Sequence, residues 1–263
     1  MTKALVLGGG GVAGIAWETG VLAGLADAGT DWTDADLIVG TSAGSAVAAQ
    51  LGSGLPLADL YARQADPALQ YEELVPSVSI ASVMETILGL AAEHPEPADL
   101  RRAVSEYALA AETVPEERRR AVIAGRLPVH AWPERDLRIV AVETGAGVPV
   151  VFDRASGVGL VDAVAASCAV PGIWPPVTIN GVRYVDGGVR TSVNADLAAG
   201  HDEILILAPL PDPALDAQVA ALAGKVRVVT PDEASVAAQG TDPLSPDTRT
   251  PSAEAGRAQG RAL

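Results

Sequence analysis

The chain has few of the residues that mark disulfide-bonded or membrane-spanning proteins. It holds one cysteine, Cys168, among 263 residues, so no internal disulfide can form, and a lone thiol is typical of a reducing compartment. No apolar run approaches the roughly 18 residues that a membrane-spanning helix needs. The apolar run at the N-terminus is too short for a signal peptide and fits a strand. We therefore expect a cytoplasmic protein.

Basic and aromatic residues are also scarce. The chain has 18 Lys and Arg residues against 33 Asp and Glu residues, a formal net charge of -15. Nucleic-acid binding depends on neutralising phosphates, so we expect no nucleic-acid partner, and only transient contact with a membrane. Aromatic residues make up 3% of the chain although 49% of it is hydrophobic. The core must therefore consist of Ala, Val, Leu and Ile, which suit layered α/β folds.

What the chain does contain, in its first fifty residues, is an alternation of short apolar runs and helical patterns. Residues 4–7 predict a buried strand, and residues 12–27 have apolar positions at helical spacing. The run "LIVG" at 37–40 predicts a second strand, followed by a helix of small residues at 42–51. This order is typical of a parallel α/β sheet.

Residues 56–130 predict a helical cap or insertion without strands. Ser82 and Thr113 each stand three residues before a glutamate, the capping-box pattern that starts a helix. An apolar stripe between Ile80 and Leu90 is most simply core. The alternative is a cap helix over an active site that offers an apolar face to lipid.

Strands return after the cap. We expect two strands at 137–144 and 148–153 joined by a tight turn, and a helix at 159–168. Three later strands lie in "VRYVDGG", "EILILAPL" and "VRVVTP", before a loop and short C-terminal helix at 239–263. The sequence therefore predicts one domain over 1–263, a three-layer α/β/α fold with a mostly parallel central sheet.

A glycine cluster follows the first strand. Gly9 to Gly14 satisfy G-x-G-x-x-G, the dinucleotide fingerprint, which also requires an acidic residue at the end of the second strand. That strand ends in Gly40, Thr41 and Ser42, so the fingerprint is incomplete. Consecutive glycines at a helix N-terminus also expose backbone N–H groups, which favour a negative charge such as an oxyanion.

Two further motifs carry candidate reacting groups. The pentapeptide "GTSAG" (40–44) is G-x-S-x-G at a strand-to-helix junction, where small neighbours let a nucleophilic serine occupy a sharp turn. In a chain with 27 glycines it can arise by chance, and its place between a strand and a helix supports the functional interpretation. The tripeptide "DGG" (186–188) is most often a turn, but it also presents a carboxylate beside an unobstructed backbone.

In this order, the three motifs resemble the patatin-like phospholipase family from about Leu5 to Asn194. The block "SCAVPGIWPP" before the aspartate is similar as well. The resemblance implies a serine hydrolase of lipid or small acyl esters, without cofactor or metal. The residues that it assigns are the nucleophile Ser42, its base Asp186, the oxyanion-hole residues Gly9, Gly10 and Gly11, and the motif-supporting Gly40, Gly44, Gly187 and Gly188. One departure is Ala13, where the family usually carries Arg or Lys.

Two alternatives stay open at this stage. An α/β-hydrolase triad of Ser42, Asp186 and His201 has the right chain order, but about 40 residues before the serine leave room for only two strands. The second alternative is a non-catalytic member of the family that binds a ligand. Trp17 and Trp174 are candidates for an acyl groove, although such residues are more often core. No cluster with metal-ligand spacing is present, and nothing predicts an oligomeric state.

Overall fold

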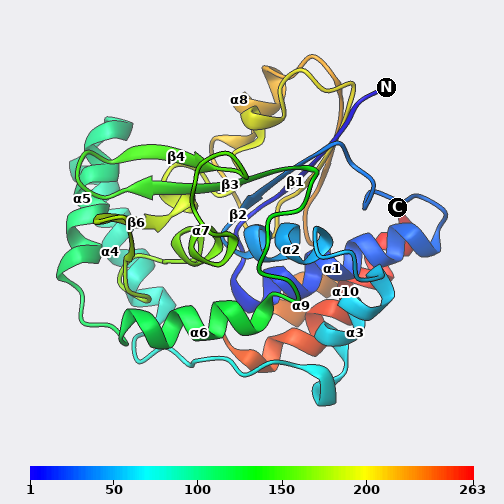
Figure 1. Ribbon diagram of the computed structural model, residues 1–263, viewed down its shortest axis with the longest axis horizontal. Coiled ribbons are helices and arrows are strands. Elements are labelled where there is room, and N and C mark those ends of the chain that lie inside the picture. The colour runs from blue at the N-terminus through cyan, green and yellow to red at the C-terminus, as the bar shows by residue number, and fades with distance from the viewer.

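The computed structural model describes residues 1–263 and has an eight-stranded sheet with helices on both faces (Figure 1). The strands are β1 (Lys3–Leu7), β2 (Leu37–Thr41), β3 (Asp136–Glu143), β4 (Val148–Phe152), β5 (Val177–Ile179), β6 (Val182–Asp186), β7 (Glu203–Leu207) and β8 (Lys225–Val229). The α-helices are α1 (Gly11–Asp27), α2 (Ala43–Leu51), α3 (Leu57–Ala65), α4 (Ile80–Glu93), α5 (Pro97–Ala110), α6 (Glu116–Arg126), α7 (Leu160–Ser167), α8 (Leu215–Ala220), α9 (Glu233–Gln239) and α10 (Arg249–Ala262).

The sheet is mixed, with a parallel centre. Strands β3, β2, β1, β7 and β8 are neighbours in that order and run parallel. At the β3 end of the sheet, β4 and β6 each pair antiparallel with β3, and β5 pairs antiparallel with β6. This confirms the three-layer α/β/α prediction, in which strand-helix units place the carboxyl ends of the parallel strands at one edge of the sheet.

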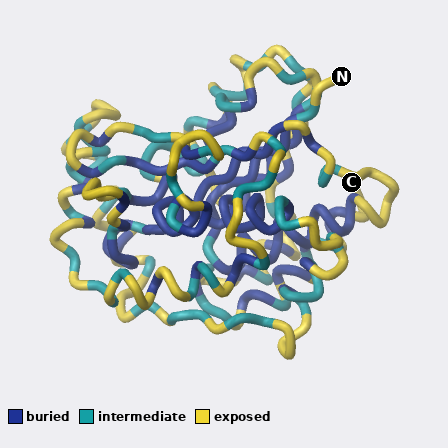
Figure 2. Tube along the Cα trace, in the orientation of Figure 1, coloured by how far each residue is buried: buried dark blue, intermediate teal, exposed yellow.

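The alternation of side chains along β1 divides the core between the two faces of the sheet. Leu5 and Leu7 belong to the larger hydrophobic cluster, under α1, α2 and α7. Ala4 and Val6 belong to a smaller cluster on the opposite face, covered by α8 and the short 3-10 helix at 195–198. The buried residues accordingly run through the middle of the molecule (Figure 2). Both faces of a central strand are apolar because both are covered.

The C-terminal helix is longer than the sequence predicted. α10 has 14 residues and lies along α1. A Cβ atom at Gly20 would collide with the Ala253 carbonyl oxygen, and one at Gly256 would collide with the Trp17 carbonyl oxygen. The two helices therefore touch backbone to backbone. Trp17 is core as expected, with its indole N–H donating to Gln259 at 2.9 Å.

Residues 56–130 contain the helices α3 to α6, a short 3-10 helix and a loop at 70–79, and no strand, and two details differ from the expectation. The helix at Ser82 begins earlier, because Ser79 caps α4 and accepts a hydrogen bond from the amide of Ala81. Pro115, rather than Thr113, precedes α6. A proline without N–H loses nothing at such a position. No helix of the chain has both the length and the apolar character to cross a bilayer.

The apolar stripe of α4 is mostly outside the core, contrary to our expectation. Val83 is its one buried residue. Met84 is 41% exposed and Leu88 is 70% exposed. The helix packs mainly on α5 and on a small cluster around Trp174 that is separate from the two main cores. The stripe is therefore divided. Ile80, Val83 and Ile87 pack on this cluster, and Met84 and Leu88 lie on the outer surface of the cap.

Candidate active site

Ser42 occupies a strained turn between β2 and α2. Its backbone has φ 52° and ψ -115°, a conformation that non-glycine residues seldom adopt. Its amide donates to the Ser167 hydroxyl at 2.9 Å, and its carbonyl accepts from the Ser45 hydroxyl at 2.6 Å and from the Cys168 thiol at 3.1 Å. The end of α7 thus fixes the turn from outside the motif. A strained serine held in this way is typical of a nucleophile elbow.

The two motif glycines allow the chain around Ser42 to pack without side chains. A Cβ atom at Gly40 would lie 2.6 Å from Ser45 Cα, and one at Gly44 would collide with the Leu7 carbonyl oxygen. The amide of Gly44 instead donates to Gly8 at 2.9 Å. The turn is therefore built directly against the end of β1.

We expect Gly44→Ala to destabilise the protein by about 1–3 kcal/mol, because the added methyl group must displace the backbone of β1. Gly89→Ala on the exposed part of α4 is the matched control. Nothing lies within 4 Å of its Cβ position, and removal of a helical glycine should increase stability by roughly 0.5–1 kcal/mol. Urea unfolding measures both. Equal effects of the two variants would contradict the tight packing of the elbow.

Asp186 reaches Ser42 through the pairing of β3. Val140 pairs with both β2 and β4, and Ala141 pairs with both β4 and β6, so β2 and β6 share the edge of β3 opposite β4. β2 is parallel to β3 and β6 is antiparallel to it, so their carboxyl ends run toward each other. Thr41 pairs with Val140 and Asp186 with Ala141. The two ends therefore meet head to head.

The Asp186 carboxyl group is buried, with a side that faces the serine. Burial raises its pKa from 3.8 to about 7, against the opposing effects of the Ser42 hydroxyl, the Gly188 amide and the charge of Arg119. Oδ1 accepts from the Gly188 amide at 2.7 Å, while Oδ2 has no partner with full hydrogen-bond geometry. The Ser42 hydroxyl thus affects the pKa of the carboxyl group without forming a hydrogen bond of full geometry.

Backbone amides with no partner lie beside the serine. Gly10 and Gly11 donate to no acceptor in the protein, nor does Ala43 at the start of α2. Gly11 and Ala43 line the same cavity as Ser42. Gly9 differs from the expectation, because its amide already donates to the Ser192 carbonyl at 2.8 Å. Its Cβ position lies 3.5 Å from Ser42 Cβ, an ordinary contact distance, so Gly9 lies directly beside the serine.

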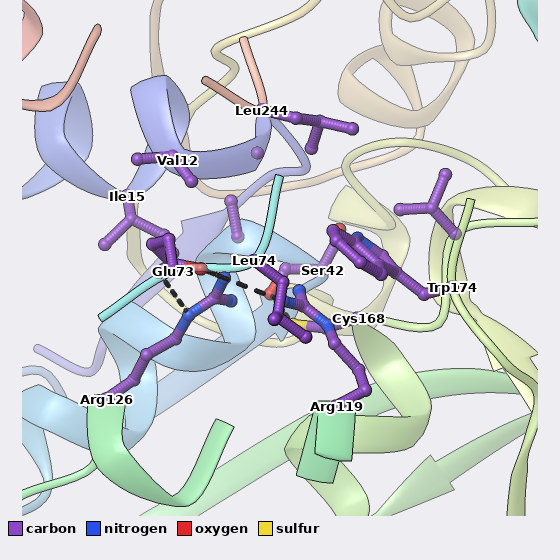
Figure 3. Close-up of a pocket in the computed structure, with 13 residues that line it drawn as sticks. Val12, Ile15, Ser42, Glu73, Leu74, Arg119, Arg126, Cys168, Trp174 and Leu244 are labelled. Atoms are coloured by element: carbon purple, nitrogen blue, oxygen red, sulfur yellow. Dashed lines mark hydrogen bonds and ion pairs between the residues drawn. The ribbon is translucent and has the colours of Figure 1, made fainter. Parts of the chain in front are cut away.

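The cavity at Ser42 is small. Its volume of about 20 Å³ has room for roughly one water molecule. Cap residues Glu73 and Leu74 cover it, together with Trp174 and Leu244 (Figure 3). The apolar cover comes from segments far apart in the chain, so the sequence did not reveal it.

Beside the cavity is a buried ionic cluster that the sequence also did not reveal. Arg126 binds the Glu73 carboxylate through two hydrogen bonds of 2.9 and 2.7 Å, and Arg249 adds one of 2.8 Å. Arg119 lies 3.7 Å from the same carboxylate. Burial alone would raise the pKa of Glu73, but the three arginines outweigh it and hold that pKa below its ordinary value. The cluster fixes the covering segment in place.

A comparison with family models assigns the chain. The model described as "Patatin-like phospholipase" matches residues 5–199. The chain belongs to the patatin-like phospholipase family. The structure is similar to VipD from Legionella pneumophila, with 13% sequence identity, a TM-score of 0.51 and coverage of 98% of this chain and 66% of VipD. At that identity the similarity concerns the fold.

A second similar structure is the type III effector protein ExoU, with 18% identity, a TM-score of 0.43 and coverage of 99% of this chain and 52% of ExoU. This chain therefore spans 66% of VipD and about half of ExoU. A search of curated protein sequences finds no significant match.

In this member of the patatin-like family, no histidine is near Ser42. His201 precedes β7, whose first residue pairs with Lys3 at the start of β1, whereas Ser42 follows the end of β2. Five-residue strands separate the two edges by roughly 16 Å. The Ser–Asp–His alternative is therefore wrong for His201. His94 and His130 are also absent from the cavity lining; His130 is exposed as expected, and His94 is half-buried.

Other predicted residues have defined places. Gly187 is required because a Cβ atom there would collide with the Val140 carbonyl oxygen. Trp174 lines the cavity. Asn194, whose role the sequence did not suggest, is buried and donates to the Thr41 hydroxyl at 3.0 Å and to the Gly187 carbonyl at 3.5 Å. It joins the residue before the serine to the residue after the aspartate. No group of three or more His, Cys, Asp or Glu side chains is arranged to hold a metal ion.

Proposed function

We propose that this protein hydrolyses carboxylic esters of lipids through a Ser42–Asp186 dyad and an acyl-enzyme. The observation that carries the proposal is a buried carboxyl group, with a pKa raised to about 7, at the end of β6 that meets the strained turn of Ser42. A carboxylate with an ordinary pKa is a poor base near neutral pH, and one raised by burial is a useful one. Membership of the patatin-like phospholipase family supports lipid esters as the substrate class.

Each step uses groups already described. Ser42 Oγ attacks the ester carbonyl while its proton passes to Asp186 Oδ2, the oxygen without a partner. The free amides of Gly10, Gly11 and Ala43 hold the oxyanion that forms. Collapse of the tetrahedral intermediate returns the proton to the leaving alcohol. Water then attacks the acyl-enzyme while Asp186 again accepts a proton, and this proton passes to Ser42 Oγ as the fatty acid leaves.

Substrate enters only if the cap moves, since the cavity holds about one water molecule. Apolar side chains on the outer surface of the cap include Val75, Met84 and Leu88, which are 71%, 41% and 70% exposed. Contact of this surface with aggregated lipid would favour an open cap, because it covers apolar area. We therefore place the proposed transient membrane contact at the cap.

The raised pKa of Asp186 predicts the pH dependence of hydrolysis. Asp186 accepts a proton only when ionised, so kcat/KM should rise about tenfold per pH unit below a pKa near 7 and level off above it. An aspartate at its ordinary pKa would give full activity from about pH 5. The rate of fatty-acid release from a neutral ester across this range is the measurement. A profile that is flat from about pH 5 to pH 8 would contradict Asp186 as the base.

A fluorophosphonate probe tests the proposed function directly. We expect one covalent adduct, located on Ser42 by peptide mass spectrometry, because the probe reacts with activated serines. A panel of p-nitrophenyl esters of increasing chain length, measured with and without detergent micelles, then gives the acyl preference and any activation by lipid aggregates. A chain that neither forms the adduct nor hydrolyses any ester is a ligand-binding protein rather than a hydrolase.

A further inference from the structure

Arg119 on α6 is a buried cation without a hydrogen-bond partner for two of its nitrogen atoms. Its side chain is 6% exposed, and neither Nε nor Nη1 has an acceptor. Its guanidinium group lies over the Trp174 ring, 3.9 Å from the ring centroid. Stacking orients the group but satisfies none of its N–H donors in the ring plane. A buried arginine in this state is costly unless an anion joins it.

The nearby carboxylates do not fill this role. Arg126 and Arg249 already engage both oxygens of Glu73 at hydrogen-bond distance, whereas Arg119 is 3.7 Å away. Even with Asp186, whose pKa Arg119 lowers, three guanidinium groups face two carboxyl groups. Burial and the neighbouring Arg126 lower the pKa of Arg119 to about 9. This small region of an acidic protein therefore has excess positive charge.

Arg119, which has no anion at hydrogen-bond distance, shares the Ser42 cavity. Arg119, Ser42 and Leu74 all line it, and Leu74 also lines an outer groove of about 270 Å³ against α6. Figure 3 shows Arg119 extending from α6 toward the serine, beside Leu74. Movement of Leu74 would join the cavity to the groove. The glycine loop has no cation of its own, since position 13 is alanine.

We propose that Arg119 binds the phosphate of a glycerophospholipid while Ser42 attacks its ester, and that Leu74 is the gate through which this substrate enters. This inference rests on the proposed function. Phosphate and ester carbonyl are a few bonds apart in such a lipid, which fits a cation and a nucleophile in one small cavity. Guanidinium groups form strong charge-assisted hydrogen bonds to phosphate. The free backbone amides are left for the oxyanion.

The test compares two substrates that differ only in the phosphocholine headgroup, dihexanoyl phosphatidylcholine and dihexanoylglycerol, as monomers at about pH 8. At this pH Asp186 is ionised and Arg119 is charged. Arg119→Gln should lower kcat/KM for the phospholipid by about 10- to 100-fold, mainly through KM, and change it less than about threefold for the neutral ester. Arg119→Lys, which retains the charge, should give an intermediate loss. Arg120→Gln, on the exposed side of α6, should match the wild type on both substrates.

A binding measurement makes the test independent of turnover. Calorimetry with the non-hydrolysable diether analogue of the phospholipid should show that Arg119→Gln, alone among the glutamine variants, binds the analogue about 10- to 100-fold more weakly than the wild type. Thermal melts establish that each variant is folded. Equal losses of kcat/KM on both substrates would overturn the inference, because Arg119 would then act on Asp186 or on the oxyanion rather than on the phosphate. Unchanged kinetics and binding would overturn it as well. Failure of the wild type to react with a fluorophosphonate or with the neutral ester is a different result, which refutes the proposed function.

Discussion

Ser42→Ala is expected to reduce ester hydrolysis at least about ten-thousand-fold, to the level that binding and the oxyanion amides can sustain without a nucleophile. The fold should survive, because the turn is held by backbone contacts of Ser42 with Ser167, Ser45 and Cys168 rather than by its hydroxyl. Hydrolysis of a p-nitrophenyl ester and the loss of fluorophosphonate labelling are the measurements. Residual activity near the wild-type level would refute Ser42 as the nucleophile.

Asp186→Asn should lower hydrolysis by a similar factor. An amide oxygen can still accept from the Gly188 amide, so the local structure is retained, but the side chain can no longer take a proton. His201→Ala is the matched control. His201 contacts the Ala198 carbonyl at the far edge of the sheet, so the variant should hydrolyse esters at nearly the wild-type rate. A large loss in His201→Ala would contradict the dyad.

The same asparagine substitution should stabilise the protein above about pH 7. The carboxyl group has a pKa of about 7 when folded and 3.8 as reference, so between these values the folded state holds a proton that the unfolded state releases. Stability therefore falls as pH rises through this range, by up to about 4 kcal/mol from a shift of about three units. An asparagine avoids this cost. Melting temperatures of wild type and variant should diverge between about pH 4 and pH 7, with the variant higher.

Glu73→Gln is expected to destabilise the protein by about 3–5 kcal/mol. The substitution leaves the side chains of Arg119, Arg126 and Arg249, which are 6%, 4% and 1% exposed, without their shared counter-ion. Because the folded-state pKa of Glu73 is lowered, its contribution to stability is present above the unfolded pKa and is lost as pH falls through the folded value. Urea unfolding at neutral pH measures the difference.

The control for this prediction is the preceding residue. Glu72 is exposed, so Glu72→Gln should change the unfolding free energy by less than about 0.5 kcal/mol. If Glu73→Gln were as stable as Glu72→Gln, the arginines would be neutralised by another group. The pair of variants therefore isolates the effect of charge at the buried position.

The parts of the site that the sequence predicted are those encoded by local patterns. A short apolar run followed by small residues and a glycine predicted β2, the turn at Ser42 and α2, because strand length and turn chemistry depend on neighbours in the chain. The start of α6 and the exposed part of the α4 stripe were misjudged because local patterns carry no information on tertiary contacts. A capping pattern predicts where a helix can begin, and an amphipathic stripe predicts that the helix has an apolar face. Neither predicts which surface of the molecule that face packs against.

What the sequence by itself determined is the order of strands and helices along the chain and the sharp turn at Ser42, since both follow from interactions over a few residues. The tertiary structure alone decided that Asp186 meets Ser42, because β2 and β6 end against the same edge of β3. It also decided that arginines from α6 and α10 surround the cap residue Glu73. Buried charges interact through space, so their partners are set by how distant segments pack and leave no mark in the local sequence.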